Sequence, residues 1–394
     1  MPEYSDATEN NNEKGHKKRG ASRKFVSTMA GVLAVALATA YSLPSNGNEL
    51  LPFLSRIAPH PSHSYVTVVM PSVVKPQGRP MRLSSIAATW GPLSHAIYVV
   101  HNLTDFPEAP LLAPTLKTYP QNLLVPPEIS AEDAGLPRMN YVIRTVYEQL
   151  NPDFAFFVND HTFVISDHMC SYLCDKSPDQ HLYAGHALKN DQDAFNSGAA
   201  GYFLSRATMK GLVAKWDEGN ELCLVKNGKS KWLQNNPGLA TAACLAQEMG
   251  VHAIDTRDGG KSHRFHAFGL VGMVAGKVDQ WYINKHQHFK GVPGFDESYA
   301  DLPTGEACCS RETISFHYVE YSETTVLFHI RQELLARPSM ADAELKAMMI
   351  KEWPTEWAML GGYSKPLPKE EDTGGWTPLL KAVRMVSTPS KVTC

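Results

Sequence analysis

Three short segments in the first half of the chain are rich in β-branched and aromatic residues, and helical patterns separate them. The segments are Tyr65–Met70, Ala96–Val100 and Phe154–Val158, and such runs are typical of strands. A helix is predicted over Arg82–Gly91, between the first two. Apolar residues recur at helical spacing from Met139 to Leu150, before the third. This alternation predicts an α/β fold in which helices cover both faces of a parallel sheet.

The second half of the chain continues the mixed pattern. Helices are predicted over Arg206–Trp216, Leu239–Met249 and Ala341–Trp353, and a strand over Ile314–Val319. Ser339 precedes the last helix and is predicted to cap it, because serine is a favoured N-cap residue. The sequence contains no internal repeat, so a repeat architecture is not expected.

An uncharged segment, Phe25–Leu43, follows a basic N-terminal tail at residues 1–24. Its 19 residues are close to the length that a helix needs to cross a bilayer. Because the positive charges precede this segment, we expect a single-pass type II membrane protein with the tail in the cytosol and the remainder in a lumen. A cleaved signal peptide is the alternative, since Ala38–Ala40 resembles a cleavage site.

The rest of the chain is expected to have three parts. Residues 44–62 contain Pro, Ser, Asn and Gly and are interpreted as a short stem. Residues 63–332 are expected to form the main domain, and residues 333–394 a C-terminal extension. The helix predicted in the extension is expected to pack on the domain. Packing is also suggested by the tryptophans of the extension, Trp353, Trp357 and Trp376.

Composition and cysteine usage narrow the classes of function. The net charge of −3 gives no reason to expect binding to nucleic acid. The seven cysteines agree with a secretory lumen, and their odd number leaves at least one free or paired between chains. Their spacing does not fit a structural zinc site. Cys308 and Cys309 are sequence neighbours, so each is predicted to pair with a distant cysteine. Asn102 begins an N-glycosylation sequon.

Polar residues follow the strand predicted at Phe154–Val158. They are Asn159, Asp160 and His161. In open α/β sheets, ligands bind beyond the carboxyl ends of the strands. We therefore expect the chemistry of this protein at this position.

Five segments form a set in this order along the chain. They are Ser84–Gly91, Phe156–Ile165, Phe195–Ser205, Asp255–Phe268 and Cys308–Val319. Together they resemble the core 1 β1,3-galactosyltransferases, within the fringe-like β3-glycosyltransferases. The resemblance implies a GT-A nucleotide-sugar-binding fold, a Rossmann-like mixed sheet flanked by helices, behind an N-terminal transmembrane helix. It also implies an inverting transfer of a sugar from a UDP donor.

The resemblance implies a metal site. Relatives bind manganese through the last aspartate of a short aspartate run and through a later histidine. The matching residues here are His161, in Asn159–Asp160–His161, and His317. We therefore expect a divalent cation, Mn²⁺, between these two imidazoles, which should face one another, with Asn159 and Asp160 near the nucleotide sugar. Neutral imidazole is a competent ligand, but fewer carboxylates predict weaker binding of the cation.

The resemblance also implies contacts with both substrates. Trp90 and the glycines Gly198 and Gly201 are expected near the UDP-sugar, where small residues let the backbone approach closely. Trp281 and Tyr282 match an aromatic stretch on the acceptor side. Aromatic faces stack on sugars, although adjacent aromatic residues more often belong to a core.

Relatives have two further features in the segment around Cys223 and Cys244. These cysteines match a disulfide-bonded pair, so a bond between them is predicted. Relatives also carry an acidic pair just before the helix that follows, and an inverting transfer needs a general base. This chain has Asn235–Gly238 there, without a carboxylate. Asp255 and Asp258 are the remaining candidates for the base.

The function implied is transfer of a hexose, galactose, from a UDP-sugar to a GalNAc-type acceptor on a glycoprotein or glycopeptide, in β1,3 linkage, during O-glycan synthesis. The location implied is the Golgi or ER membrane, with the domain in the lumen. Two alternatives stay open. In the first, the chain is a fringe-like β3-glycosyltransferase with another donor. In the second, it is a catalytically degenerate member that acts as a binding protein or chaperone. A homodimer is also left open.

Overall fold

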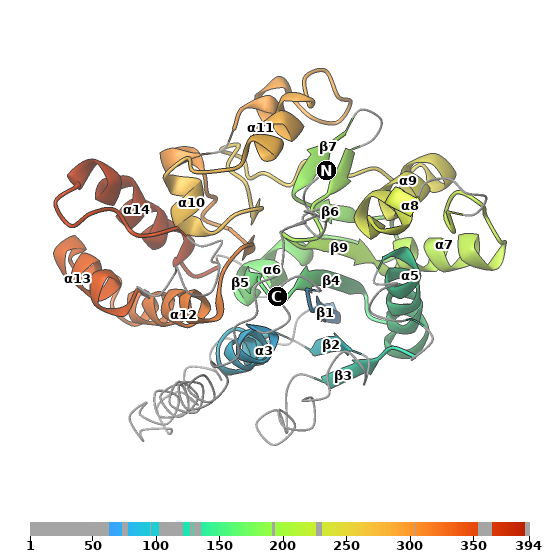
Figure 1. Ribbon diagram of the computed structural model, residues 1–394, viewed down its shortest axis with the longest axis horizontal. Helices are drawn as coiled ribbons and strands as arrows, with labels where there is room; N and C mark the ends of the chain where they lie inside the picture. The colour runs from blue at the N-terminus through green and yellow to red at the C-terminus, as the bar shows by residue number, and fades with distance from the viewer. Residues whose placement is uncertain are drawn as a thin grey trace, which may run out of the picture. The chain divides into compact units, whose positions relative to one another are not determined.

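A six-stranded sheet forms the centre of the computed structural model (Figure 1). The strand order is β3 (Gln121–Leu124), β2 (Ile97–His101), β1 (Tyr65–Met70), β4 (Phe154–Asn159), β9 (Tyr202–Ser205) and β6 (Tyr183–Gly185). The first four strands run parallel, and β9 runs antiparallel to both of its neighbours. The three predicted strands of the first half are therefore confirmed as neighbours in a parallel arrangement.

The structure describes residues 63–72, 78–94, 96–101, 121–126, 129, 135–190, 194–225, 231–302, 304–353 and 365–390. Residues 60–394 form one compact unit, and residues 1–59 fall in a separate unit. The predicted tail, membrane anchor and stem lie outside the described residues, as do Asn102, Trp357 and Cys394. No helix within the described ranges is long and apolar enough to cross a membrane.

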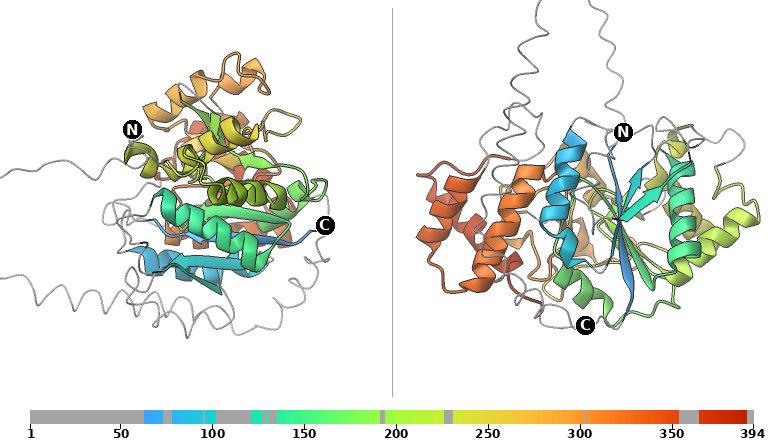
Figure 2. Two further views of the ribbon diagram at one scale, coloured as in Figure 1. Left: turned by 90° about the vertical axis from the view of Figure 1, so that its right-hand side faces the viewer. Right: turned by 90° about the horizontal axis from the view of Figure 1, so that it is seen from below.

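Helices cover both faces of the large sheet (Figure 2). On one face lie α3 (Arg79–Ala88) and α12 (Tyr321–Ala336), which pack against each other. On the other lie α5 (Leu136–Thr145), which continues as the π-helical turn η3 (Val146–Leu150), and α7 (Arg206–Asp217). The strands β1 and β4 between them are buried on both faces, as the apolar run Phe154–Val158 predicts for β4. The mixed α/β class is thus confirmed.

Two small sheets stand beside the large one. In the first, β10 (Phe265–His266) pairs in parallel with β11 (Ser315–Phe316), which pairs antiparallel with β5 (Phe163–Val164). The second joins β7 (Ala187–Lys189) to β8 (Ala194–Asn196). The strand predicted over Ile314–Val319 was too long, because Tyr318 adopts φ +57° and the extended backbone ends before it.

The remaining helices surround these sheets. They are η2 (Gly91–Leu93), α6 (Ser166–Leu173), α8 (Lys231–Gln234), α9 (Pro237–Met249), α10 (Leu270–Val274), α11 (Gln280–Gln287), η4 (Glu297–Ala300), η5 (Gly305–Ala307), α13 (Asp342–Glu352) and α14 (Thr373–Val386). The helices predicted from Arg206 and Leu239 are confirmed with small shifts at their ends, as is usual for helix termini.

The C-terminal helices α13 and α14 pack on the rest of the domain, as predicted for α13. Leu345, Met349, Trp353 and Trp376 are all buried in the common core. The boundary expected after residue 332 falls inside α12. The predicted cap was wrong, because α13 begins after Ala341 without a side-chain cap and Ser339 lies too far ahead of it.

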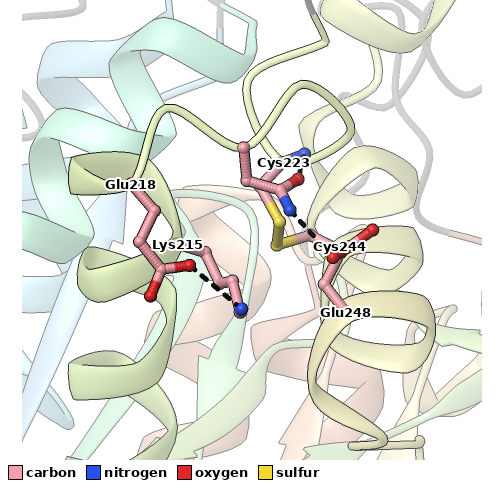
Figure 3. The surroundings of a disulfide bond; sticks show 6 residues. Lys215, Glu218, Cys223, Cys244 and Glu248 are labelled. Atoms are coloured by element: carbon pink, nitrogen blue, oxygen red, sulfur yellow. Dashed lines mark hydrogen bonds and ion pairs between the residues drawn. A yellow bond between two sulfur atoms is a disulfide. The ribbon is translucent and has the colours of Figure 1, made fainter.

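The predicted disulfide between Cys223 and Cys244 is confirmed, and it ties the loop after α7 to α9 (Figure 3). The prediction for Cys308 and Cys309 was wrong, because these two cysteines are bonded to each other. The turn that follows η5 brings both side chains to the same side of the chain, and both are fully buried. Among the described cysteines, Cys174 is a free thiol.

Breaking the long-range disulfide is expected to destabilise the protein. Cys223 and Cys244 are separated by 21 residues, and closing a loop of that length in the unfolded chain corresponds to about 3 kcal/mol. The double variant Cys223→Ser/Cys244→Ser should lose about that much free energy of unfolding in a denaturant titration. Cys308→Ser/Cys309→Ser is the matched control, because that bond closes almost no loop. An equal loss in both double variants would contradict this account.

Candidate functional site

The candidate site lies where the order of the parallel strands reverses. The chain builds β2 and β3 on one side of β1, and then places β4 on its other side. Met70 at the end of β1 is paired with Asn159 at the end of β4. The carboxyl ends at such a switch point are where open α/β sheets bind their ligands. The residues singled out after β4 are therefore in the expected position.

Asn159 shapes the turn that presents His161. Its Oδ1 atom accepts hydrogen bonds from the backbone N–H of His161, at 2.9 Å, and from the hydroxyl of Thr162, at 3.1 Å. Asparagine side chains commonly fold the following backbone in this way. The turn leads directly into β5, so the position of His161 is determined by local hydrogen bonds.

Asp160 joins three segments. Its carboxylate accepts a hydrogen bond from the backbone N–H of Ser72, at 2.8 Å, and from Nε of Arg82, also at 2.8 Å. The Arg82–Asp160 ion pair is almost completely buried, with side-chain exposures of 2% and 0%. The structure places Asp160 at the switch point, where it connects the turn after β4 to the end of β1 and to α3.

His317 reaches the same place through the pairing of β11 with β5. Phe316 is paired with Phe163, and just beyond this pair the backbone N–H of Val319 donates to the carbonyl of His161 at 2.9 Å. The imidazole rings of His161 and His317 lie edge to face with their centres 6.4 Å apart. The two rings that we expected to face one another are therefore together, and both are buried.

The partners of His317 define its tautomer. Its Nδ1 atom lies 3.3 Å from the carbonyl of Ala267, which can only accept a hydrogen bond, so Nδ1 carries the proton. Its Nε2 atom lies 3.0 Å from Nδ2 of Asn159, which can only donate a hydrogen bond, so Nε2 is the acceptor. Burial lowers the pKa of His317 well below its usual range, and the neighbouring His161 lowers it further. The ring is therefore neutral at physiological pH, with its lone pair on Nε2.

Glu320 is a site residue that the sequence analysis missed. It is the N-cap residue of α12 and is buried. Its Oε1 atom lies 3.8 Å from Nδ1 of His161. Its position directly after the segment Cys308–Val319 was the available signal, but only the fold shows that its carboxylate lies near His161.

The histidine pair suits a divalent cation. A ligating imidazole has its ring centre roughly 3 Å from the ion, so rings whose centres are 6.4 Å apart can hold one ion after a small movement. Within the described part of the chain, no three histidine, cysteine or acidic side chains are grouped to hold an ion by themselves. Hard cations are often bound by one or two side chains, with phosphates and water completing the shell. The residues present therefore fit a cation that binds together with a diphosphate.

The turn at Gly198–Gly201 lies against this site. The hydroxyl of Thr162 shares its one proton between Oδ1 of Asn159, at 3.1 Å, and the carbonyl of Ala199, at 2.8 Å. Gly201 has φ +89°, and a Cβ atom there would lie 2.6 Å from the ring of Phe156, so glycine is required for packing on β4. Gly198 is exposed, and a Cβ atom there would meet nothing closer than 4.0 Å. The backbone at Gly198 is therefore open to a ligand, whereas Gly201 faces the core.

The aromatic residues expected at the substrates lie in or beside the core. Trp90 is 1% exposed and belongs to the main apolar cluster. Tyr282 is fully buried in α11, with its hydroxyl 3.0 Å from Nε2 of His186. Trp281 is half-buried, and its indole N–H donates to Asp279 at 3.3 Å.

The two candidates for the catalytic base both have partners within their own segment. Asp255 forms an ion pair with Arg257 at 2.7 Å. Asp258 accepts hydrogen bonds from the backbone N–H groups of Gly260, at 2.8 Å, and Ser262, at 3.0 Å.

A second group of buried histidines contains His186, His263, His266 and His286. His186 and His286 contact Tyr282, and His263 and His286 contact Tyr299. Nε2 of His186 lies 3.1 Å from Nε2 of His286. Burial lowers the pKa of His286 to about 4 and the pKa of His266 to about 3. Burial also lowers the pKa values of His186 and His263 well below their usual range, and the neighbouring imidazoles add to that effect. All four rings are therefore neutral in the folded protein at neutral pH.

Folding stability is expected to fall as the pH is lowered from 7 to 5. The unfolded chain binds protons on these histidines below a pH of about 6.5, whereas the folded pKa of His286 is about 4. His286 alone then accounts for about 2 kcal/mol at pH 5. Thermal unfolding at a series of pH values should show the loss, with a smaller slope in His286→Gln. A midpoint that stays constant from pH 7 to pH 5 would contradict this expectation.

Comparison with known proteins finds a relative among the galactosyltransferases. No protein-family model matches the chain. Glycoprotein-N-acetylgalactosamine 3-beta-galactosyltransferase 1 of Xenopus laevis is 30% identical over 190 residues, which are 45% of this chain and 46% of the relative. The chain is similar to a galactosyltransferase. It matches about half the length of this relative, and the match supports the resemblance drawn from the five segments.

Proposed function

We propose that this chain is an inverting glycosyltransferase that moves galactose from a UDP-sugar to a GalNAc-type acceptor on glycoproteins, in β1,3 linkage. The observation that carries the proposal is the meeting of His161 and His317 at the switch point of an α/β sheet. The relative's name, a galactosyltransferase that acts on glycoprotein N-acetylgalactosamine, supplies the substrates.

His161 and His317 would hold Mn²⁺, and the bound ion would stabilise the departing diphosphate as a Lewis acid. The low pKa of His317, caused by its burial, keeps Nε2 unprotonated, so a cation can bind there without release of a proton. Glu320 would orient His161 and supply negative charge, as carboxylates beside metal-binding histidines commonly do. The open backbone at Gly198 would face the donor sugar.

The proposal is tested by incubating the purified luminal segment with UDP-galactose, Mn²⁺ and a peptide that carries GalNAc. We expect a product with one additional hexose, whose linkage NMR identifies as β1,3. Other UDP-sugars test the donor. If no UDP-sugar is turned over, and neither UDP nor any UDP-sugar raises the thermal midpoint, the proposed function is wrong.

A second candidate is a binding protein or chaperone of the same fold. It is favoured by the segment Asn235–Gly238, which carries amides where relatives have an acidic pair, and by the ion pair of Asp255 with Arg257. The same assay separates the two candidates. Binding of UDP or of the glycopeptide without any transfer would select the second.

We also propose that residues 25–43 anchor the protein in the Golgi or ER membrane, with the domain in the lumen. Two disulfide bonds support an oxidising compartment. Protease protection in microsomes tests the topology. Digestion of the domain without detergent would overturn it.

A further inference from the structure

Both the oxygen and the nitrogen of the Asn159 side-chain amide form hydrogen bonds. Oδ1 accepts from the backbone N–H of His161 and from the hydroxyl of Thr162. Nδ2 donates to Nε2 of His317 at 3.0 Å, across 158 residues of sequence. A single amide therefore holds the two proposed metal-binding histidines in their present positions.

Asn159 is hydrogen-bonded to the atom of His317 that a cation would bind, which is Nε2. The Nδ1 atom of His317 faces the carbonyl of Ala267, so the lone pair that can bind an ion is on Nε2. That lone pair already accepts the amide proton of Asn159. The single lone pair of Nε2 can accept a hydrogen bond or bind a metal ion, but it cannot do both at once.

We propose that the Asn159–His317 hydrogen bond, called the lock below, holds the site in a metal-free form. It thereby raises the cation concentration that is needed to fill the site. This proposal rests on the proposed function, since it concerns the same metal site. A cation must displace the amide from His317 before it can bind. The amide N–H would then be left in a half-buried place without its partner, which is unfavourable. The lock should weaken cation binding by roughly tenfold to a hundredfold.

An aspartate at position 159 would reverse this effect. Asn159→Asp preserves the shape of the side chain and the oxygen that accepts from His161 and Thr162. It replaces the donor that faces His317 with a second acceptor. Without a metal, two acceptors then face each other, and a cation between them relieves the conflict. The variant therefore changes the proposed lock and retains the turn.

The first experiment measures Mn²⁺ affinity by calorimetry in the full domain, with and without UDP. We expect Asn159→Asp to bind Mn²⁺ at least tenfold more tightly than the unmodified protein, and to have a lower thermal midpoint in the presence of a chelator. Thr162→Val is the matched control, because it removes a hydrogen bond to Oδ1 but leaves Nδ2 unchanged. Its Mn²⁺ affinity should stay within about twofold. An unchanged affinity in Asn159→Asp, or an equal gain in Thr162→Val, would overturn the lock.

The second experiment separates the lock from the added charge. A crystal structure of the unmodified protein at saturating Mn²⁺ should show Nε2 of His317 on the ion and Nδ2 of Asn159 moved out of hydrogen-bonding distance. An ion bound while the Asn159–His317 bond is intact would overturn the proposal. Both results are independent of transfer activity. A failure of the lock with normal UDP turnover therefore leaves the proposed function in place, and a lack of turnover with the expected Mn²⁺ affinities leaves the lock in place.

Discussion

His317→Ala is expected to abolish the dependence of UDP binding on Mn²⁺ and to reduce transfer by roughly 100-fold or more. The physical reason is the small number of ligands. Only His161 and His317 are proposed to hold the ion, and no group of three metal-binding side chains is present in the described ranges. Loss of one imidazole leaves a single ligand, and the charge on the departing diphosphate is then poorly stabilised.

The measurement is the shift of the thermal midpoint by UDP, with Mn²⁺ and with a chelator, beside the transfer rate. The matched control is His252→Ala, an exposed histidine, which should behave like the unmodified protein. His317 is buried, so the midpoint without ligands must also be compared. If His317→Ala retains a Mn²⁺-dependent UDP shift, the ion is held elsewhere.

Arg82→Met is expected to destabilise the protein by about 3–5 kcal/mol. The substitution leaves the carboxylate of Asp160 buried beside the end of β1 without its ion-pair partner. A buried charge that loses its partner has neither water nor a counter-charge to stabilise it. Because Asp160 connects β1, α3 and the turn that presents His161, donor binding should weaken as well.

The free energy of unfolding in urea measures the effect. The double variant Arg82→Met/Asp160→Asn should recover much of the loss, because it removes both charges. Arg144→Met is the control for an exposed pair, since Arg144 and Asp217 have side-chain exposures of 31% and 60%, and it should change stability by at most about 1 kcal/mol. Equal losses for Arg82→Met and Arg144→Met would contradict the importance of the buried pair.

The fold class could be predicted from local pattern. The run at Phe154–Val158 is apolar throughout, the run at Tyr65–Met70 is apolar apart from Thr67, and such runs become strands that are buried on both faces. Helical spacing from Met139 predicted a helix, and the structure has α5 and η3 there. These elements depend on residues that are close in sequence, so their signal is in the sequence itself.

Pairing between distant segments could not be predicted in the same way. The two-residue strands β5 and β11 have too few residues for a periodic signal, yet their antiparallel pairing brings His317 beside His161. The bond between Cys308 and Cys309 was also mispredicted, because it depends on the backbone conformation of the turn after η5.

The sequence by itself determined the mixed α/β class, the polar turn after β4 and the set of segments that resembles the galactosyltransferases. Only the tertiary structure decided what the polar residues contact. Asp160 binds Arg82, Asn159 binds His317, and Glu320 lies 3.8 Å from His161. The physical reason is that strand and helix preferences arise from neighbouring residues, whereas the partner of a buried polar side chain is set by which distant segments the sheets bring together.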